Sequence, residues 1–171
     1  MSKNKDFFIH YNQFKDKIYN YFLYRIGFDK VLAEDLTSEV FVKAYKNFDT
    51  FDQNRKFQSW IFAIAHNHLV NYYGQSAKVT ISLEIVEDYL LEEESHEVEI
   101  KYEAEQVLRV IDSMNENDKE VLRLKFVEEL NNQEIAEVIG KDEGAIRTQI
   151  SRSLKRLRQL LNEDNNIDLM K

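Results

Sequence analysis

The chain has 171 residues and a formal net charge of -8, and 43% of its residues are hydrophobic. Its length allows one domain or two small ones, and the absence of cysteine excludes disulfides, thiolate zinc sites and thiol redox chemistry. No apolar run approaches the roughly 20 residues that span a bilayer. No cleavage site follows an apolar stretch at the N-terminus, so we expect a cytoplasmic protein without membrane insertion.

Charge and aromatic residues are distributed unevenly along the chain. Residues 79–103 hold nine Asp and Glu against one Lys, whereas residues 1–78 hold 11 Lys and Arg against eight acids, and 104–161 hold 10 against 11. Of the 21 aromatic residues, 18 precede residue 79. We therefore expect two small domains with different cores, 1–78 and 104–161, joined by an acidic linker at 79–103 and followed by a polar tail at 162–171.

The fold class is predicted to be all-α, because the chain has no proline and only four glycines to punctuate short strands. The first helix is predicted over residues 5–26, with an apolar face at steps of three and four: Phe7, Tyr11, Phe14, Ile18, Phe22 and Ile26. Gly27 is expected to cap it. The second, over 31–47, has the stripe Leu32, Leu36, Val40 and Ala44. After a loop at 48–56, the third covers about 57–73, with Trp60, Ile61, Ile64, Ala65 and Leu69 packed inward.

Residues 79–103 show no sustained hydrophobic period, and they are predicted to form a semi-ordered, flexible linker. Beyond it, Asn115 is expected to cap a helix from Glu116 to about Val127.

A capping box of Asn131 and Glu134 precedes a short helix that Gly140 ends. Asp142 then caps a longer helix from Glu143, with the core stripe Ile146, Ile150, Leu154 and Leu157. A short helix, a tight turn and a longer helix predict a helix-turn-helix.

The last helix has an unusual charge pattern for so acidic a chain. Between Gly144 and Leu161 it has five basic residues and no acid. The face beside its core stripe is expected to present Arg147, Ser151, Lys155 and Arg158, extended by Thr148, Arg152 and Arg156. In the usual docking, such a helix enters the major groove, where Arg pairs with guanine. We interpret this face as DNA-binding rather than merely solvated, because the acid-free run coincides with a capped helix-turn-helix.

Three blocks in this order and spacing resemble a known family: AEDLTSEVFVKAYKNF at 33–48, FQSWIFAIAHNHLVNYY at 57–73 and MNENDKEVLRLKFVEELNNQEIAEVIGKDEGAIRTQISRSLKRLRQLL at 114–161. They resemble bacterial RNA polymerase sigma factors of the sigma-70 family, in the extracytoplasmic-function (ECF) group, which keeps two helical domains, sigma-2 and sigma-4. The resemblance implies an alternative sigma factor that binds core RNA polymerase and directs promoter-specific initiation. It implies no enzyme, catalytic residue, cofactor or metal.

The resemblance also implies three sets of binding residues. Binding to the clamp helices of the polymerase beta-prime subunit is implied for Asp35, Leu36, Glu39, Val40 and Phe41, with Arg25 nearby. Capture of the melted -10 element is implied for Arg55, Lys56, Phe57, Trp60, Asn67 and Asn71, although a Trp on an apolar face is more often core. Reading of the -35 duplex is implied for Lys125, Gly144, Arg147, Thr148, Ser151, Arg152 and Lys155.

Within the -35 set, Arg147 is the candidate base contact, and Lys125, Arg152 and Lys155 are assigned to phosphates. The sigma-4 domain is further implied to pack on the beta flap, and an anti-sigma factor is an implied partner that no residue here identifies. The acidic stretch 84–103 is either a solubilising tether or an imitation of nucleic acid in the polymerase channels.

The -10 block departs from the family pattern. His66 and Gly74 stand where the family has Arg, and Asn71 stands where it has Asp. The loss of two cations predicts weaker duplex engagement by this domain.

Two other classes of function are less well supported. A di-iron site would need two E-x-x-H motifs, whereas only Glu93 and His96 form one. His66 and His68 are two residues apart and so point to different sides of a helix. A stand-alone helix-turn-helix regulator is the alternative, but two nearly neutral domains carry few spare cations for tight duplex binding on their own.

Overall fold

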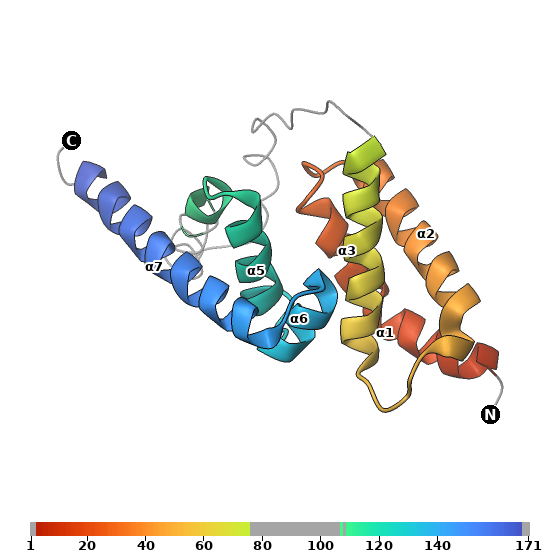
Figure 1. Ribbon diagram of the computed structural model, residues 1–171. Helices are drawn as coiled ribbons and strands as arrows, with labels where there is room; N and C mark the ends of the chain where they lie inside the picture. Colours follow the sequence, from red (N-terminus) through yellow and green to blue (C-terminus); the bar gives the residue numbers. More distant parts are fainter. Residues whose placement is uncertain (1–2, 76–106, 108, 169–171) are drawn as a thin grey trace, which may run out of the picture. The chain divides into compact units, whose positions relative to one another are not determined.

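The structure is a computed structural model that describes residues 3–75, 107 and 109–168, in which all regular elements are helices. In chain order these are α1 (Lys3–Leu23), α2 (Lys30–Asn47), the 3-10 turn η1 (Phe48–Thr50), α3 (Phe57–Gln75), α5 (Glu116–Phe126), α6 (Asn132–Ile139) and α7 (Glu143–Asp168), drawn in Figure 1. The all-α prediction is confirmed for this part of the chain. The predicted linker, 79–103, lies outside the described residues. None of the described helices is long and apolar enough to cross a membrane.

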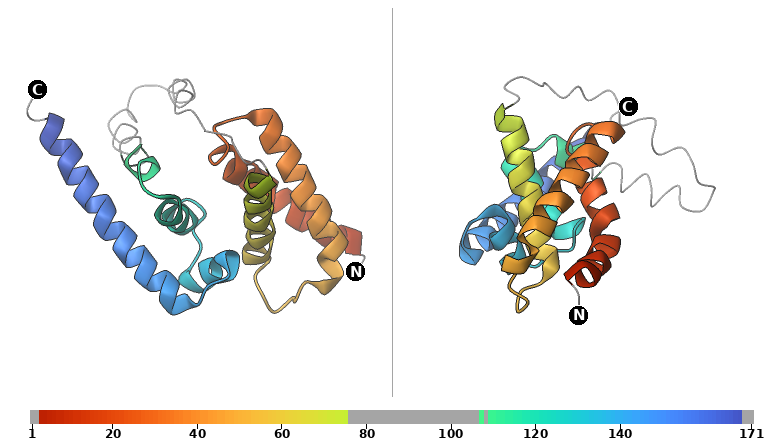
Figure 2. Two further views of the ribbon diagram at one scale, coloured as in Figure 1. Left: turned by 45° about the horizontal axis from the view of Figure 1, so that its top comes forward. Right: turned by 90° about the vertical axis from the view of Figure 1, so that its right-hand side faces the viewer.

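The described elements form two compact units, and each is considered by itself. In the first unit, α1, α2 and α3 pack against one another, as the views in Figure 2 also show. In the second, α5 packs against α7, and α6 links them along the chain.

Helix α1 buries the apolar face that its spacing predicts. Phe14, Ile18 and Phe22 are at most 5% exposed. Tyr11, expected on the same face, stays 37% exposed, because it lies at the rim of a groove of about 380 Å³ that residues of α1 and α2 line. Tyr21 is fully buried although the pattern did not include it, since its hydroxyl meets Nδ1 of His66 at 3.4 Å. A buried phenol needs such a partner.

The predicted cap at Gly27 is confirmed. Gly27 has φ 71°, and the N–H of Phe28 donates to the carbonyl of Leu23 at 3.0 Å, the long bond of a Schellman motif. Phe28 is also left-handed, with φ 62°. Asp29 then caps α2 by accepting from the N–H of Leu32 at 3.0 Å.

Helix α2 buries a slightly different stripe from the one predicted. Leu36, Val40 and Ala44 are buried as expected, but Leu32 is only half-buried. Ala33 and Phe41 complete the stripe instead.

The predicted loop at 48–56 begins with η1 and covers an aromatic cluster. Phe57 stacks on His10, with ring centroids 4.1 Å apart and planes 8° apart. Phe51 lies 5.0 Å from Trp60, and Phe57 lies 5.4 Å from Trp60. Such pairs stabilise beyond their buried area by about 0.5–1.5 kcal/mol each, so this cluster holds the start of α3 in place.

In α3, Ile61, Ala65 and Leu69 are buried as predicted. Trp60 and Ile64 are only half-buried. The buried face passes instead through Phe62, which is fully inaccessible to solvent.

The second unit confirms the predicted helix ends. Asn115 accepts from the N–H of Asp118 at 3.0 Å, and Asn131 and Glu134 exchange the two bonds of a capping box at 2.8 and 2.9 Å. Gly140 has φ 74° and ends α6. Asp142 occupies the N-cap position of α7, where its carbonyl accepts from the N–H of Ile146 at 3.1 Å.

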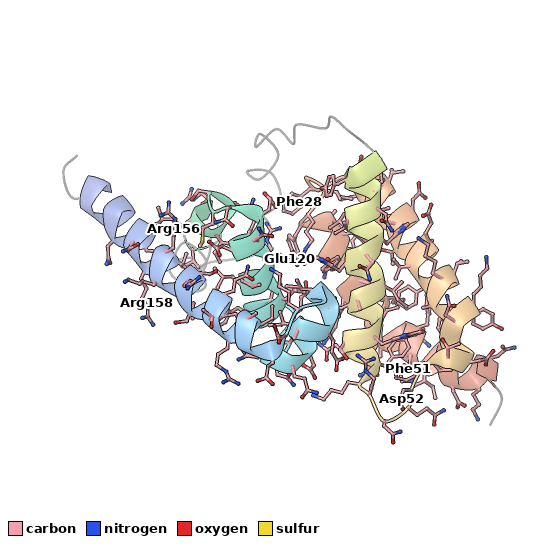
Figure 3. All side chains as sticks on the ribbon, viewed as in Figure 1. Phe28, Phe51, Asp52, Glu120, Arg156 and Arg158 are labelled. Carbon is pink, nitrogen blue, oxygen red and sulfur yellow. The ribbon has the colours of Figure 1, made fainter. Side chains whose placement is uncertain are left out.

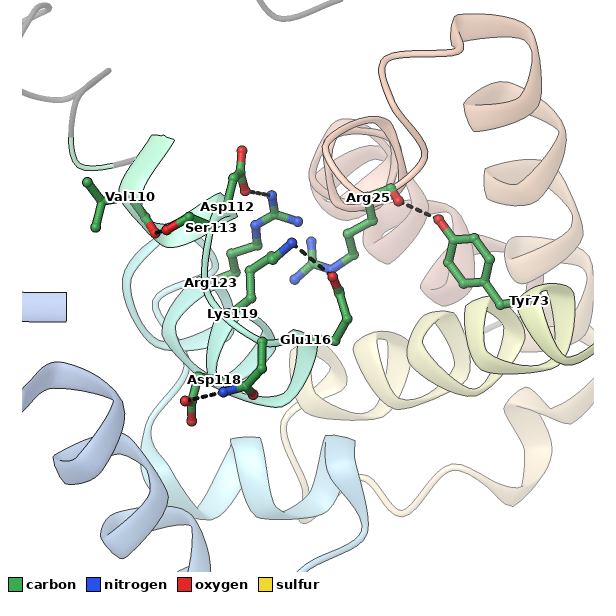
Figure 4. Close-up of polar contacts among 10 residues, drawn as sticks. Arg25, Tyr73, Val110, Asp112, Ser113, Glu116, Asp118, Lys119 and Arg123 are labelled. Atoms are coloured by element: carbon green, nitrogen blue, oxygen red, sulfur yellow. Dashed lines mark hydrogen bonds and ion pairs between the residues drawn. The ribbon is translucent and has the colours of Figure 1, made fainter. Parts of the chain in front are cut away.

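The core of this unit joins α5 and α7 to the residues before α5. Its buried members are Val110, Ile111, Met114, Leu122 and Leu157. An ion pair supports it at one edge, where Arg123 meets Asp112 at 2.5 Å (Figure 4).

Candidate nucleic-acid interface

Helix α7 divides cleanly into a buried and an exposed face. Ile146, Ile150 and Leu157 are at most 9% exposed, and Leu154 is partly buried. The other face is open to solvent and consists of the predicted residues Arg147, Thr148, Ser151, Arg152 and Lys155, with Gly144 at its start. Figure 3 shows Arg158 extending away from the body of the second unit. The helix therefore presents cations and small polar groups on an uninterrupted surface.

The predicted base contact, Arg147, has a partner that sequence reasoning missed. Its Nη2 donates to Oε1 of Glu143 at 2.8 Å, one turn earlier, while 69% of the Arg147 side chain remains exposed. The signal was present, because Glu followed by Arg four residues later is a favourable helix pair. Such an exposed pair orients the guanidinium without fixing it firmly.

Two polar contacts hold α7 against α5. The Nε2 of Gln149 donates to the carbonyl of Asn117 at 2.9 Å, and Oγ of the fully buried Ser153 donates to Oδ1 of Asp118 at 2.5 Å. Asp118 in turn accepts from Nδ2 of Asn115 at 2.6 Å (Figure 4). Because hydrogen bonds are directional, these contacts set the angle and register at which the basic face is presented.

A hollow of about 600 Å³ lies beside that face, between the N-terminal turns of α5 and α7. Lys141, Gly144, Thr148 and Arg152 contribute to its lining. A Cβ added at Gly144 would meet no atom within 4 Å, so the backbone is open to close approach from outside. Lys125, the predicted phosphate contact on α5, is partly exposed.

The predicted -10 residues divide into exposed and covered groups. Arg55, Lys56, Asn67 and Asn71 are exposed. Trp60 is half-buried against Phe51 and Phe57, as the core interpretation anticipated.

The implied contact of Phe57 with an unstacked base stays a prediction, and in the chain without DNA this ring is buried. Phe57 is 6% exposed, and its ring is stacked on His10. The sequence could not reveal this, because the first residue of a helix can face either side.

The predicted polymerase-binding set on α2 divides in the same way. Asp35 and Glu39 are exposed on one face, as their spacing predicts. Leu36, Val40 and Phe41 are 4%, 0% and 5% exposed, so their side chains belong to the core of the free chain, and their implied contact with core polymerase stays a prediction.

Arg25, expected nearby, is also buried. Its guanidinium lies 3.7 Å from the centre of the Tyr21 ring, and its Nη1 donates to the Tyr21 carbonyl at 3.0 Å. Its own carbonyl accepts from the hydroxyl of Tyr73 (Figure 4). Arg25 therefore ties the end of α1 to α3, and its implied place near the polymerase interface stays a prediction.

His68, which the sequence analysis considered only as a metal ligand, is a buried polar residue of α3. It is 9% exposed on α3, and its ring lies between two side chains of α2: Nδ1 is 2.6 Å from Nζ of Lys43, and Nε2 is 2.8 Å from Oε2 of Glu39. Burial lowers the pKa of His68, and the Lys43 ammonium lowers it further against the opposing effect of Glu39. The ring is therefore neutral near pH 7.

His66 and His68 point to different sides of α3, as predicted. His66 meets Tyr21 of α1, whereas His68 meets α2. Within the described residues, no three His, Cys, Asp or Glu side chains gather as metal ligands. The E-x-x-H pair of Glu93 and His96 lies outside those residues.

Comparison with known proteins gives two family matches and several relatives. The sigma-70 region 2 model matches residues 10–79, and the sigma-70 region 4 model matches residues 104–157. The ECF RNA polymerase sigma factor BldN of Streptomyces coelicolor is 34% identical over 90% of this chain and 60% of its own length. The ECF sigma factor SigW of Bacillus subtilis is 32% identical over 88% of this chain and 86% of its own length.

A solved structure shares the fold. The sigma factor RpoE of Bartonella quintana, crystallised with the anti-sigma factor NepR, superimposes with a TM-score of 0.69 at 18% identity. The match covers 92% of this chain and 98% of that one.

Proposed function

The chain belongs to the extracytoplasmic-function group of the sigma-70 family, and on that premise we propose that it is an alternative sigma factor, which binds core RNA polymerase and directs it to specific promoters. The observation that carries the proposal is the exposed basic face of α7, which has no acid between Gly144 and Leu161, in a capped helix-turn-helix. A sigma factor supplies promoter recognition, and the polymerase performs the catalysis, so the chain itself needs no catalytic residue. Because bacterial RNA polymerase is cytoplasmic, the proposed site of action of the chain is the cytoplasm.

In this proposal, residues 104–161 read the -35 duplex with α7 in the major groove. Arg147 makes a bidentate contact to a base, and Lys125, Arg152 and Lys155 contact phosphates. Gly144, Thr148 and Ser151 let the helix approach closely and add polar contacts. The same domain packs on the beta flap.

Residues 1–78 hold core polymerase and the melted -10 element. The exposed carboxylates of Asp35 and Glu39 contact the clamp helices of the beta-prime subunit, and the buried Leu36, Val40 and Phe41 support that face of α2 from within. Residues 79–103 are the linker, and 162–171 form the tail.

The single-stranded -10 DNA follows a polar track on the same domain. Its members are the exposed residues Arg55, Lys56, Asn67 and Asn71, with the half-buried Trp60 at its edge. Since this track carries only two cations, its grip on the duplex before melting is weak, and promoter opening relies on polymerase contacts.

The net negative charge of the chain is consistent with a protein that binds promoter DNA only together with the polymerase. With a net charge of -8, the free chain attracts duplex DNA poorly, because affinity comes largely from cations that displace counterions. One basic helix suffices once polymerase binding has brought it to the promoter. An anti-sigma factor that covers the polymerase-binding face is a further proposed partner.

The test is reconstituted transcription with bacterial core polymerase and a pool of promoter fragments. Addition of the chain should produce run-off transcripts from a subset that shares -35 and -10 elements, whereas core alone should produce none. A chain that protects an operator by itself and leaves core polymerase unspecific would instead be a stand-alone helix-turn-helix regulator.

A further inference from the structure

Two oppositely charged side chains of α2 do not form the ion pair that their spacing favours. Glu39 and Lys43 are four residues apart on α2, the spacing at which Glu and Lys normally pair directly. Within the described residues they make no direct ion pair, because the imidazole of His68 from α3 lies between them. Its two ring nitrogens lie 2.6 Å from Lys43 Nζ and 2.8 Å from Glu39 Oε2.

The chemistry of the neighbours sets the tautomer of the ring. The Lys43 ammonium can only donate, so Nδ1 must accept, and the single proton of the neutral ring resides on Nε2. Nε2 is buried and has no hydrogen bond of regular geometry to any described group, Glu39 included, but Oε2 of Glu39 lies 2.8 Å away and is the acceptor within its reach. The ring therefore accepts from Lys43 on one side and presents a proton to Glu39 on the other.

The ring is held firmly, whereas the carboxylate is not. The His68 side chain is 10% exposed and packs edge-on against Phe22 of α1, with ring centroids 6.3 Å apart. The Glu39 side chain is 61% exposed. A buried ring thus lies 2.8 Å from a carboxylate that is mostly in solvent.

We propose that His68 is a positioning residue for polymerase binding, which keeps Lys43 away from Glu39 and holds the Glu39 carboxylate on the outer face of α2 for a basic partner. This inference rests on the proposed polymerase contact of α2. Without the imidazole, Glu39 and Lys43 would close into a direct pair, and the negative charge offered to the partner would be neutralised.

Protonation of His68 has a similar effect. The charged groups that face the ring are Glu39 and Lys43 of α2, whereas α1 presents the uncharged Phe22 ring. An imidazolium can no longer accept from Lys43 and pairs tightly with Glu39 instead. Polymerase affinity should therefore fall as the pH drops through the titration of this histidine, below its unperturbed value of about 6.5.

The experiment measures the affinity of the full chain for core polymerase in a fluorescence titration. His68→Leu, which keeps the packing on Phe22, should weaken binding about tenfold, a typical coupling between contacting residues. Adding Lys43→Met to that variant should restore most of the affinity, because Glu39 is then free again. His68→Gln, whose amide can accept from Lys43 and donate to Glu39, should bind nearly as the unmodified chain does.

His10→Leu is the matched control, since it removes another partly buried histidine of the same unit that contacts neither Glu39 nor Lys43, and it should bind normally. Circular dichroism confirms that each variant is folded. From about pH 7.5 to about pH 5.5 the unmodified chain should lose affinity, and the His68→Leu chain should lose much less.

The outcomes separate this inference from the proposed function. If Glu39→Gln leaves affinity unchanged, the polymerase contact of α2 itself is wrong. If Glu39→Gln weakens binding but His68→Leu binds normally, or if Lys43→Met fails to restore it, the positioning role of His68 is overturned. Identical pH profiles for the unmodified and His68→Leu chains overturn it without reliance on affinity at neutral pH.

Discussion

The guanidinium of Arg147 is exposed on α7 and held by Glu143 at 2.8 Å. An exposed pair of this kind contributes about 0.2–1 kcal/mol, less than the roughly 1–3 kcal/mol of a bidentate base contact. Glu143 therefore orients Arg147 but does not prevent it from turning to a base.

Arg147→Ala should weaken transcription from -35-dependent promoters, because the free energy of promoter binding becomes less favourable by about 1–3 kcal/mol. It should also relax base preference at one position. Transcription from a -35 substitution library measures both effects. Lys155→Ala is the matched comparison, because loss of a phosphate contact should weaken all sequences alike and reduce the salt slope by about 1. Unchanged selectivity in the Arg147→Ala protein would remove its assignment to a base.

Glu129, in the turn after α5, has a backbone conformation that costs free energy. Its φ is 57°, in the left-handed region that favours glycine. Glu129→Gly should therefore raise the free energy of unfolding by about 0.5–1 kcal/mol, measured by urea denaturation. Glu128→Gly, one residue earlier and without a positive φ, should lower it. A destabilised Glu129→Gly chain would mean that the side chain contributes more than the strain costs.

The first turn of α7 combines a stability cost with a proposed role in -35 binding. Gly144 is exposed in a helix, where glycine costs roughly 0.5–1 kcal/mol relative to alanine, and no atom lies within 4 Å of an added Cβ. Gly144→Ala should thus raise thermal stability and yet reduce -35 affinity, because the new methyl group meets the DNA surface.

Calorimetry and promoter-binding titrations with holoenzyme measure the two effects of Gly144→Ala separately. Gly74→Ala is the control on α3, where an added Cβ also meets no atom. It should raise stability and leave -35 binding unchanged. Higher stability of Gly144→Ala with full -35 affinity would show that the DNA does not approach this turn.

The packing of α1, α2 and α3 predicts a pH dependence of stability. Burial lowers the pKa of both His10 and His68 in the folded chain. For each histidine, the unfolded chain therefore binds more protons than the folded chain at pH values between the folded pKa and the unfolded pKa. The stabilising contribution is complete above the unfolded pKa, about 6.5, and is lost as pH falls through the folded pKa.

Urea denaturation between about pH 7.5 and about pH 5 should show a falling free energy of unfolding. The slope should become shallower in His68→Leu, and shallower still when His10→Leu is added. A slope that both substitutions leave intact would assign the acid sensitivity to other groups.

For the assembled polymerase, the proposed contact of the chain is made by the exposed acids of α2. Asp35→Arg with Glu39→Arg should abolish co-elution with core polymerase while the circular dichroism spectrum stays helical, because both side chains are exposed and the core beneath them is untouched. Asp16→Arg with Glu34→Arg, which reverses two other exposed acids of this unit, is the charge-matched control and should co-elute. Normal co-elution of the Asp35 and Glu39 variant would contradict the assignment.

Much of the fold followed from local rules. Helix ends at Gly27, Asn115, Asn131 and Gly140 were predictable because capping uses side chains and φ angles within a few residues. The buried stripe of α7 was predictable because its apolar residues repeat at helical spacing without interruption.

The candidate site was predictable only in part. Exposure of Arg147, Arg152 and Lys155 follows from their position beside that stripe. The burial of Phe57 and of Arg25 does not, since it depends on His10 and on Tyr21, which other turns of the fold bring near.

The amino-acid order alone set the helical class, the caps and the basic face, because these depend on neighbours three or four residues away. Tertiary packing decided which aromatic and aliphatic side chains are left for a partner, and it placed His68 between Glu39 and Lys43. Residues 25 positions apart along the chain meet there only after α2 and α3 have packed, and no local pattern records such a meeting.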